Sequence, residues 1–238
     1  MRTMEHLIEL RRRLLWCVSS VMVGAILIWI FFNEVFSVLE QPYCSFAEST
    51  GRPCEFLITD VLEPFNVTLT VAGYGGLIVG LPVIFYHFAR FVLPALHSDE
   101  KRLVIPFVVA GVLLFAAGVA GGFFIMPAAI EVLLTFSDQE SFVPQLRAER
   151  YLGFFVRVLF AFGIAAELPL ILTFLQKVGL LTAQTLRKNR RVAIAGIVIL
   201  GAVITPTGDP FILMAVAVPM YVLFEISILL GARWSTPR

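Results

Sequence analysis

The chain has 238 residues, of which 59% are hydrophobic and 15% are charged, and its formal net charge is +1. A soluble domain has roughly 45–50% apolar and about 25% charged residues, so this composition excludes an ordinary soluble protein. Its mean hydropathy of +0.90 indicates a polytopic membrane protein. No strongly basic face suggests nucleic-acid binding, and we set that class aside.

The chain begins with an amphipathic segment, residues 4–15, that we expect to lie as a helix along the inner membrane surface. It contains LIELRRRLL at 7–15, in which Glu9 stands beside three arginines. Arg11 falls on the apolar stripe and must extend its charged head to water. Glu9 has two interpretations. It forms an i,i+4 pair with Arg13 worth a few tenths of a kcal/mol, or it accepts a cationic ligand.

Six apolar stretches are candidate spans, since about 20 residues cross a hydrocarbon layer of roughly 30 Å. The first is longer than the apolar part of a cleaved signal peptide and lacks a cleavage site, so we expect a permanent span. The last two each reach only roughly 21 Å before a break or a charge, which predicts local thinning of the bilayer. The predicted spans are 14–32, 67–89, 103–126, 152–175, 192–205 and 211–230, the last reaching Phe224 before the charge of Glu225. The fold class is therefore an all-α, six-helix transmembrane domain over 1–238.

Lysine and arginine gather before the first span, between the second and third, between the fourth and fifth, and in the tail. The positive-inside rule then places both termini in the cytoplasm. The outer connections, 33–66 and 127–151, are long. Because Pro42, Pro53 and Pro64 break the first one, we expect it to fold as a cap made of short pieces.

The three cysteines have different settings. Cys17 lies in a span, where a small apolar filler is the expected role. Cys44 and Cys54 both lie in the first outer loop, in a compartment that permits oxidation if this is a bacterial envelope. A disulfide between them would contribute roughly 2–3 kcal/mol in the chain-entropy model, and two free thiols are the alternative.

Two further carboxylates are candidate sites. Glu100 follows Ser98 and Asp99 just before the third span, so it is either ordinary helix-start chemistry or a second inner-surface carboxylate that joins Glu9 in binding two guanidinium groups. Glu167 lies deep in the fourth span, where an ionisable group costs a few kcal/mol and should face the bundle interior or a wet cavity. An ion pair with Arg157 is excluded, because the two residues lie roughly 15 Å apart along the axis of one helix. We therefore favour a functional role for Glu167 over a structural ion pair.

Small residues recur at fourfold spacing in the second and third spans, which predicts closely packed helices. They are Ala72, Gly76 and Gly80, then Gly118 and Gly122. The histidines lack paired metal spacing and no serine stands in a G-x-S-x-G setting, so we expect no enzyme, no metal and no cofactor.

Seven segments, in order, resemble the TatC family of the twin-arginine protein translocase over nearly the whole chain. They are LIELRRRLL at 7–15, TDVLEPF at 59–65, FVLPALHSDEKR at 91–102, FAFGIAAELP at 160–169, LRKNRR at 186–191, TPTGDPF at 205–211 and PMYVLFE at 219–225. The resemblance implies a concave, glove-like bundle in the inner cell membrane. It also implies a receptor for the twin-arginine signal peptides of folded precursors, with export driven by the proton gradient.

Residue roles carry over by motif. The resemblance implies that Glu9 and Glu100 bind the two arginines, since a guanidinium fork suits carboxylates and lysine cannot reproduce it. Arg11, Phe91, Lys101 and Arg102 would shape the same surface. Glu167 would contact a polar group of the single-span partners TatA or TatB. Pro42 and Asp209 match outer-loop positions associated with partner contact or assembly, including further TatC copies.

The chain departs from the family pattern in two places. Tyr86–His87–Phe88–Ala89 stands where many relatives have Tyr-Gln-x-Trp, and the cysteine pair is not part of the pattern. The rival interpretation is a proton-coupled carrier of small solutes that titrates Glu167. Such carriers usually contain internal repeats, and none links the two halves of this chain.

Overall fold

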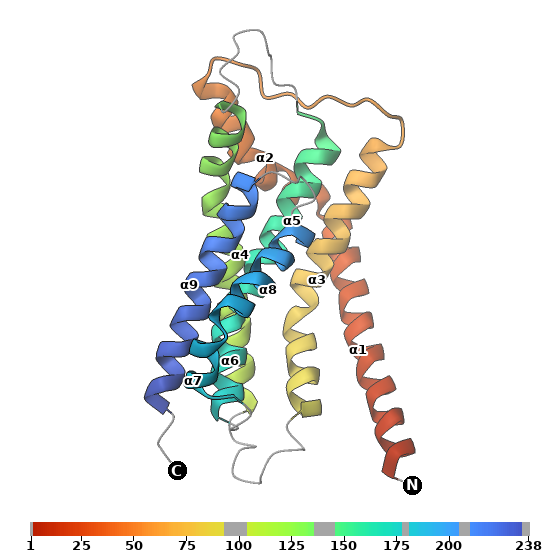
Figure 1. Ribbon diagram of the computed structural model, residues 1–238. Helices are drawn as coiled ribbons and strands as arrows, with labels where there is room; N and C mark the ends of the chain where they lie inside the picture. Colours follow the sequence, from red (N-terminus) through yellow and green to blue (C-terminus); the bar gives the residue numbers. More distant parts are fainter. Residues whose placement is uncertain (1, 93–103, 136–145, 178–180, 205–209, 235–238) are drawn as a thin grey trace. The chain divides into compact units, whose positions relative to one another are not determined.

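The computed structural model describes residues 2–92, 104–135, 146–177, 181–204 and 210–234 (Figure 1). Within these ranges the chain is helical, apart from turns and one isolated parallel bridge between Leu57 and Arg147. The helices are α1 (Arg2–Ile30), α2 (Phe32–Ser49), α3 (Glu63–Val92), α4 (Val104–Thr135), α5 (Ala148–Ala166), α6 (Leu168–Lys177), α7 (Ala183–Lys188), α8 (Arg190–Ile204) and α9 (Pro210–Trp234). The predicted all-α class is confirmed.

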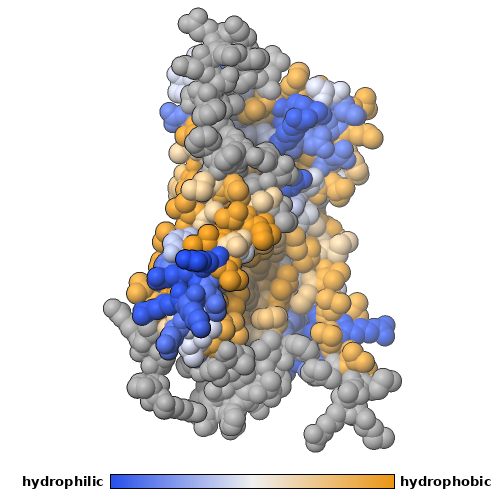
Figure 2. All heavy atoms as spheres, viewed as in Figure 1, coloured by the Kyte–Doolittle hydropathy of each residue, from blue (hydrophilic) through white to orange (hydrophobic). Residues whose placement is uncertain are grey.

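Four long apolar segments match the four full-length predicted spans. They are Leu7–Ile30, Glu63–Arg90, Ile105–Val132 and Ala148–Gln176, and a shorter apolar helix covers Val216–Leu229. Figure 2 shows apolar side chains over much of the visible length of the helices, with hydrophilic ones gathered towards their ends. This pattern is that of a membrane protein, since side chains facing lipid must be apolar.

Several helix bounds differ from the sequence expectations. The surface helix and first span are one continuous helix, α1. The first half of the first outer loop is the single helix α2, which contains Pro42 in its interior rather than ending there. Helix α4 continues through Pro127 to Thr135, beyond the predicted end at 126.

The two predicted short helices also differ from each other. Helix α8 has 15 residues and is short, as expected. Helix α9 has 25 residues, so the expectation of a second short helix is wrong. Glu225 lies inside it, where one carboxyl oxygen accepts from Arg190 Nη2 at 2.7 Å and the other from the Tyr221 hydroxyl at 2.8 Å.

The chain forms two compact units. Unit 1 contains residues 1–112 and 133–156, and unit 2 contains 113–132 and 157–238. In unit 1, α1 lies along α3, and glycine makes the close approach possible: a Cβ on Gly76 would lie 2.7 Å from both the Ala25 nitrogen and the Val21 oxygen. In unit 2, Gly122 similarly packs against the Phe162 side chain. The predicted small-residue packing is confirmed in both places.

Candidate functional site

The first candidate site is the N-terminal end of α1, where Glu9 and Arg13 form an ion pair. Arg13 Nε donates to Glu9 Oε1 at 3.1 Å, and Arg13 Nη1 donates across to the His87 carbonyl of α3 at 3.3 Å. The Arg13 side chain is only 14% exposed, whereas that of Glu9 is 47% exposed. The helical pair is therefore formed, and it leaves the carboxylate open to solvent.

Aromatic and basic side chains surround this pair. The Trp16 ring stacks on His87 with centroids 6.4 Å apart, which fixes the end of α3 against α1. Arg90 donates to the Tyr86 hydroxyl at 2.8 Å and lies over the Tyr86 ring. Arg11 is exposed, as snorkelling requires. One acidic group thus sits within a basic, partly aromatic helix end.

Several predicted residues cannot be placed with this end. Glu100, Lys101, Arg102 and Asp209 lie outside the described residues, and for Phe91 only the backbone, in the last turn of α3, is described. Of the six residues expected to bind a signal peptide, Glu9 and Arg11 are brought to the same helix end. The pairing of Glu9 with Glu100 stays a prediction.

The second candidate site is Glu167, which stands at a break between α5 and α6. Pro169 has no N–H and cannot bond the Ala165 carbonyl, so the helix is interrupted, and the Glu167 amide bonds Ile164 three residues back at 3.0 Å. The side chain is buried in unit 2, with 4% of its surface exposed. Neither carboxyl oxygen has a hydrogen-bond partner among the residues that the structure describes. Within the described residues, Glu167 and Arg157 form no ion pair.

The outer cap predicted for residues 33–66 is built around α2. Cys44 and Cys54 form a disulfide with Cα atoms 4.9 Å apart, which resolves the open choice in favour of the bond. Pro42 is buried beside Tyr43, whose hydroxyl donates to the Glu55 carbonyl at 3.4 Å. The cap is therefore a folded piece and not a hanging loop.

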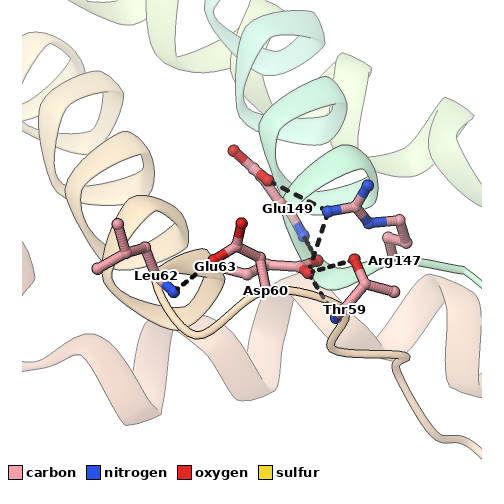
Figure 3. A network of polar contacts seen from close by, with 6 residues as sticks. All are labelled: Thr59, Asp60, Leu62, Glu63, Arg147 and Glu149. Atoms are coloured by element: carbon pink, nitrogen blue, oxygen red, sulfur yellow. Dashed lines mark hydrogen bonds and ion pairs between the residues drawn. The ribbon is translucent and has the colours of Figure 1, made fainter.

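A buried carboxylate joins this cap to the start of α5, through side chains drawn in Figure 3. The Glu63 side chain is 0% exposed. Its oxygens accept from the Thr59 amide at 2.9 Å, from the Thr59 hydroxyl at 3.2 Å, and from Arg147 Nη2 at 3.2 Å. The Glu149 amide donates to the second oxygen at 3.3 Å. A buried charge with this many donors is satisfied, so Glu63 holds the network together.

An aromatic cluster packs beside the same network. Ring centroids lie 5.0 Å apart for Tyr43 and Phe56 and 5.4 Å apart for Phe56 and Tyr151. The Tyr151 hydroxyl donates to the Leu39 carbonyl at 2.9 Å. Tyr151 thereby ties the first turn of α5 to α2.

Sequence reasoning missed these clusters. The contact between Glu63 and Arg147 has no signal in the sequence, because 84 residues separate the two and no local pattern links them. The Arg190–Glu225 pair was equally invisible to periodicity, although each residue lies in a segment that carries the family resemblance. The sequence signal that could have indicated these pairs is a carboxylate at the edge of an apolar stretch, such as Glu63 or Glu225, because such a carboxylate needs a cationic partner.

Comparisons with known proteins agree over nearly the whole chain. The family model for "Sec-independent protein translocase protein (TatC)" matches residues 5–219. A Sec-independent protein translocase protein TatC from Desulforapulum autotrophicum is 38% identical over 96% of this chain and 83% of its own length. One from Aquifex aeolicus is 36% identical over 95% and 93%. A crystal structure described as the twin-arginine translocase receptor TatC is similar with a TM-score of 0.87, at 33% identity, covering 97% of this chain and all of that one.

Proposed function

The chain belongs to the TatC family of Sec-independent protein translocase components, which are non-enzymatic membrane proteins, and on that premise we propose that it is the signal-peptide receptor of its translocase. The peptides bound would carry two adjacent arginines ahead of an apolar segment. The observation that carries the proposal is Glu9, a half-exposed carboxylate at the N-terminal end of the first long apolar helix.

The chemistry of that helix end suits a guanidinium ligand. A carboxylate accepts two parallel N–H bonds from an arginine fork, a geometry that a lysine ammonium does not offer. Arg13 Nε and Nη2 already donate to one oxygen of Glu9, Oε1, so an incoming arginine would exchange with or share this pairing. Glu100 is the proposed second acceptor, with Arg11, Phe91, Lys101 and Arg102 shaping the surface around it.

The membrane arrangement follows from the charge distribution. We place six spans in the cytoplasmic membrane with both termini inside, since lysine and arginine favour the cytoplasmic side. Glu167 is the proposed contact for a polar group of TatA or TatB, because its buried carboxyl has no hydrogen-bond partner among the described residues and a polar group from another subunit would supply one. Pro42 and Asp209 are proposed outer-side contacts with partners or further copies. Transport would draw on the proton gradient.

The test is photocrosslinking of a twin-arginine signal peptide to the purified protein in nanodiscs, with a twin-lysine peptide as the specificity control. Glu9→Gln and Glu100→Gln should each weaken binding about ten- to a hundredfold, the loss expected for one charged hydrogen-bonded contact. Glu48→Gln, an exposed carboxylate on α2, is the matched control and should bind normally. Normal crosslinking in both test variants would overturn the assignment of these two residues.

The rival, a proton-coupled solute carrier using Glu167, predicts a different behaviour on purification. A carrier should purify alone and take up solute in vesicles. The translocase component should retain small single-span partners and lose them in Glu167→Ala. Loss of solute uptake in that variant, with no partners in the wild type, would favour the carrier.

A further inference from the structure

A groove of about 460 Å³ lies between α1 and α3 in unit 1. Its lining is apolar over most of its length. At its N-terminal end, Arg13 from α1 and His87 from α3 are the polar lining residues. Met22 lies at the other end of the α1 wall. The groove therefore has a polar end and an apolar body.

The length of the groove matches one leaflet of a bilayer. From Arg13 to Met22, α1 rises about 14 Å at 1.5 Å per residue, which is close to half of a hydrocarbon core of roughly 30 Å. Leu14, Val18 and Met22 line this stretch and are each more than half exposed. An extended acyl chain lying along them would cover apolar surface from headgroup level to the bilayer centre.

The charge at the polar end selects the headgroup. Arg13 uses three of its N–H groups on Glu9 and the His87 carbonyl, and a guanidinium has five, so donors remain for another acceptor. Arg12 is exposed at the same end of α1, and Arg90 is exposed three residues beyond His87. Glu9 offsets only part of this positive charge. An anionic phosphate is complementary to the arginines at this end.

We propose that this groove binds an anionic phospholipid, with one acyl chain between α1 and α3 and the phosphate at Arg13. The site shares Arg13 with the proposed peptide contact, because Arg13 pairs with Glu9, but its ligand is an anion whereas the ligand of Glu9 is a cation. The lipid would come from the leaflet that holds the N-terminal end of α1. It would fill the space beside His87.

Fluorescence quenching by brominated lipid tests the proposal. Trp16 stacks on His87 at the groove's polar end, so a Trp29→Phe/Trp234→Phe protein reports from this place. In phosphatidylcholine nanodiscs, a minor fraction of brominated phosphatidylglycerol should quench Trp16 with about fivefold higher relative affinity than the same fraction of brominated phosphatidylcholine. This ratio is equivalent to about 1 kcal/mol for one arginine at an anionic lipid.

Substitutions at two positions, Arg13 and Val18, separate the parts of the site. Arg13→Gln should lower the ratio of the relative affinities for brominated phosphatidylglycerol and brominated phosphatidylcholine to about one. Arg13→Lys should retain most of the wild-type ratio. Val18→Phe narrows the groove and should reduce quenching by both lipids. Val23→Phe, on the same helix with similar exposure but outside the lining, is the matched control and should leave quenching unchanged.

Two results would overturn the proposal. Equal quenching by the two brominated lipids in the wild-type background would mean that the groove meets only bulk lipid. Relief of quenching by an added signal peptide, without any headgroup preference, would mean that the groove receives the apolar segment of the peptide instead. Neither result bears on twin-arginine crosslinking to Glu9, which is measured separately.

Discussion

Substitution of Gly76 by alanine should destabilise the protein by separating α1 from α3. The added Cβ would lie 2.7 Å from the Ala25 nitrogen and the Val21 oxygen, which are backbone atoms and cannot rotate away. Because ordinary contacts with carbon are about 3.5–4.0 Å long, the two helices must move apart by about 1 Å. Overpacking of this kind costs about 1–3 kcal/mol.

The chain offers a matched control on the same helix. A Cβ on Gly73 meets nothing within 4 Å, so Gly73→Ala should be neutral or, through helix propensity, up to about 1 kcal/mol more stable. Both variants are compared by titrating detergent-solubilised protein with dodecyl sulfate and following helix content by circular dichroism. Adding Ala25→Gly to Gly76→Ala removes only the side-chain clash, so recovery should be partial. Equal unfolding midpoints for Gly76→Ala and Gly73→Ala would refute the packing argument.

Two predictions concern the outer cap. Replacing Cys44 and Cys54 by serine should lower the free energy of unfolding of the cap by about 3 kcal/mol, the loop-closure value for so short a loop, and protease resistance of α2 should fall with it. Unchanged gel mobility of the wild-type protein on reduction, with both thiols open to alkylation, would contradict this. Glu63→Gln should destabilise the cap more than Glu149→Gln. The Glu63 carboxylate is buried and accepts several hydrogen bonds, whereas the Glu149 carboxylate is partly exposed and lies 3.7 Å from Arg147 Nη2. Equal thermal unfolding temperatures for the two variants would contradict the proposed role of Glu63.

Sequence reasoning found the elements whose signals are local. Hydropathy over about 20 residues located the four long apolar segments, because a helix that crosses lipid must be apolar along its whole length. The i,i+4 spacing of Glu9 and Arg13 likewise predicted their ion pair. The glycine spacing predicted where helices approach closely.

The remaining features depend on contacts distant in sequence. Helix α9 extends past Glu225, which pairs with Arg190 from another helix, and no periodicity reports that pairing. Helix α2 was expected to break at Pro42, since proline usually ends a helix, yet that residue is buried inside α2. The sequence could not decide between a disulfide and two free thiols, because the spacing of two cysteines in the chain does not give the distance between their Cα atoms.

The Glu63–Arg147 contact sets an order for synthesis of the protein. Glu63 begins α3, but the guanidinium that bonds its carboxylate comes 84 residues later in the chain. While a ribosome is still producing α4, the donors from Arg147 and Glu149 do not yet exist, and the carboxylate must stay hydrated. The bonds from Arg147 and Glu149 to Glu63 can therefore form only after the start of α5 has been synthesised.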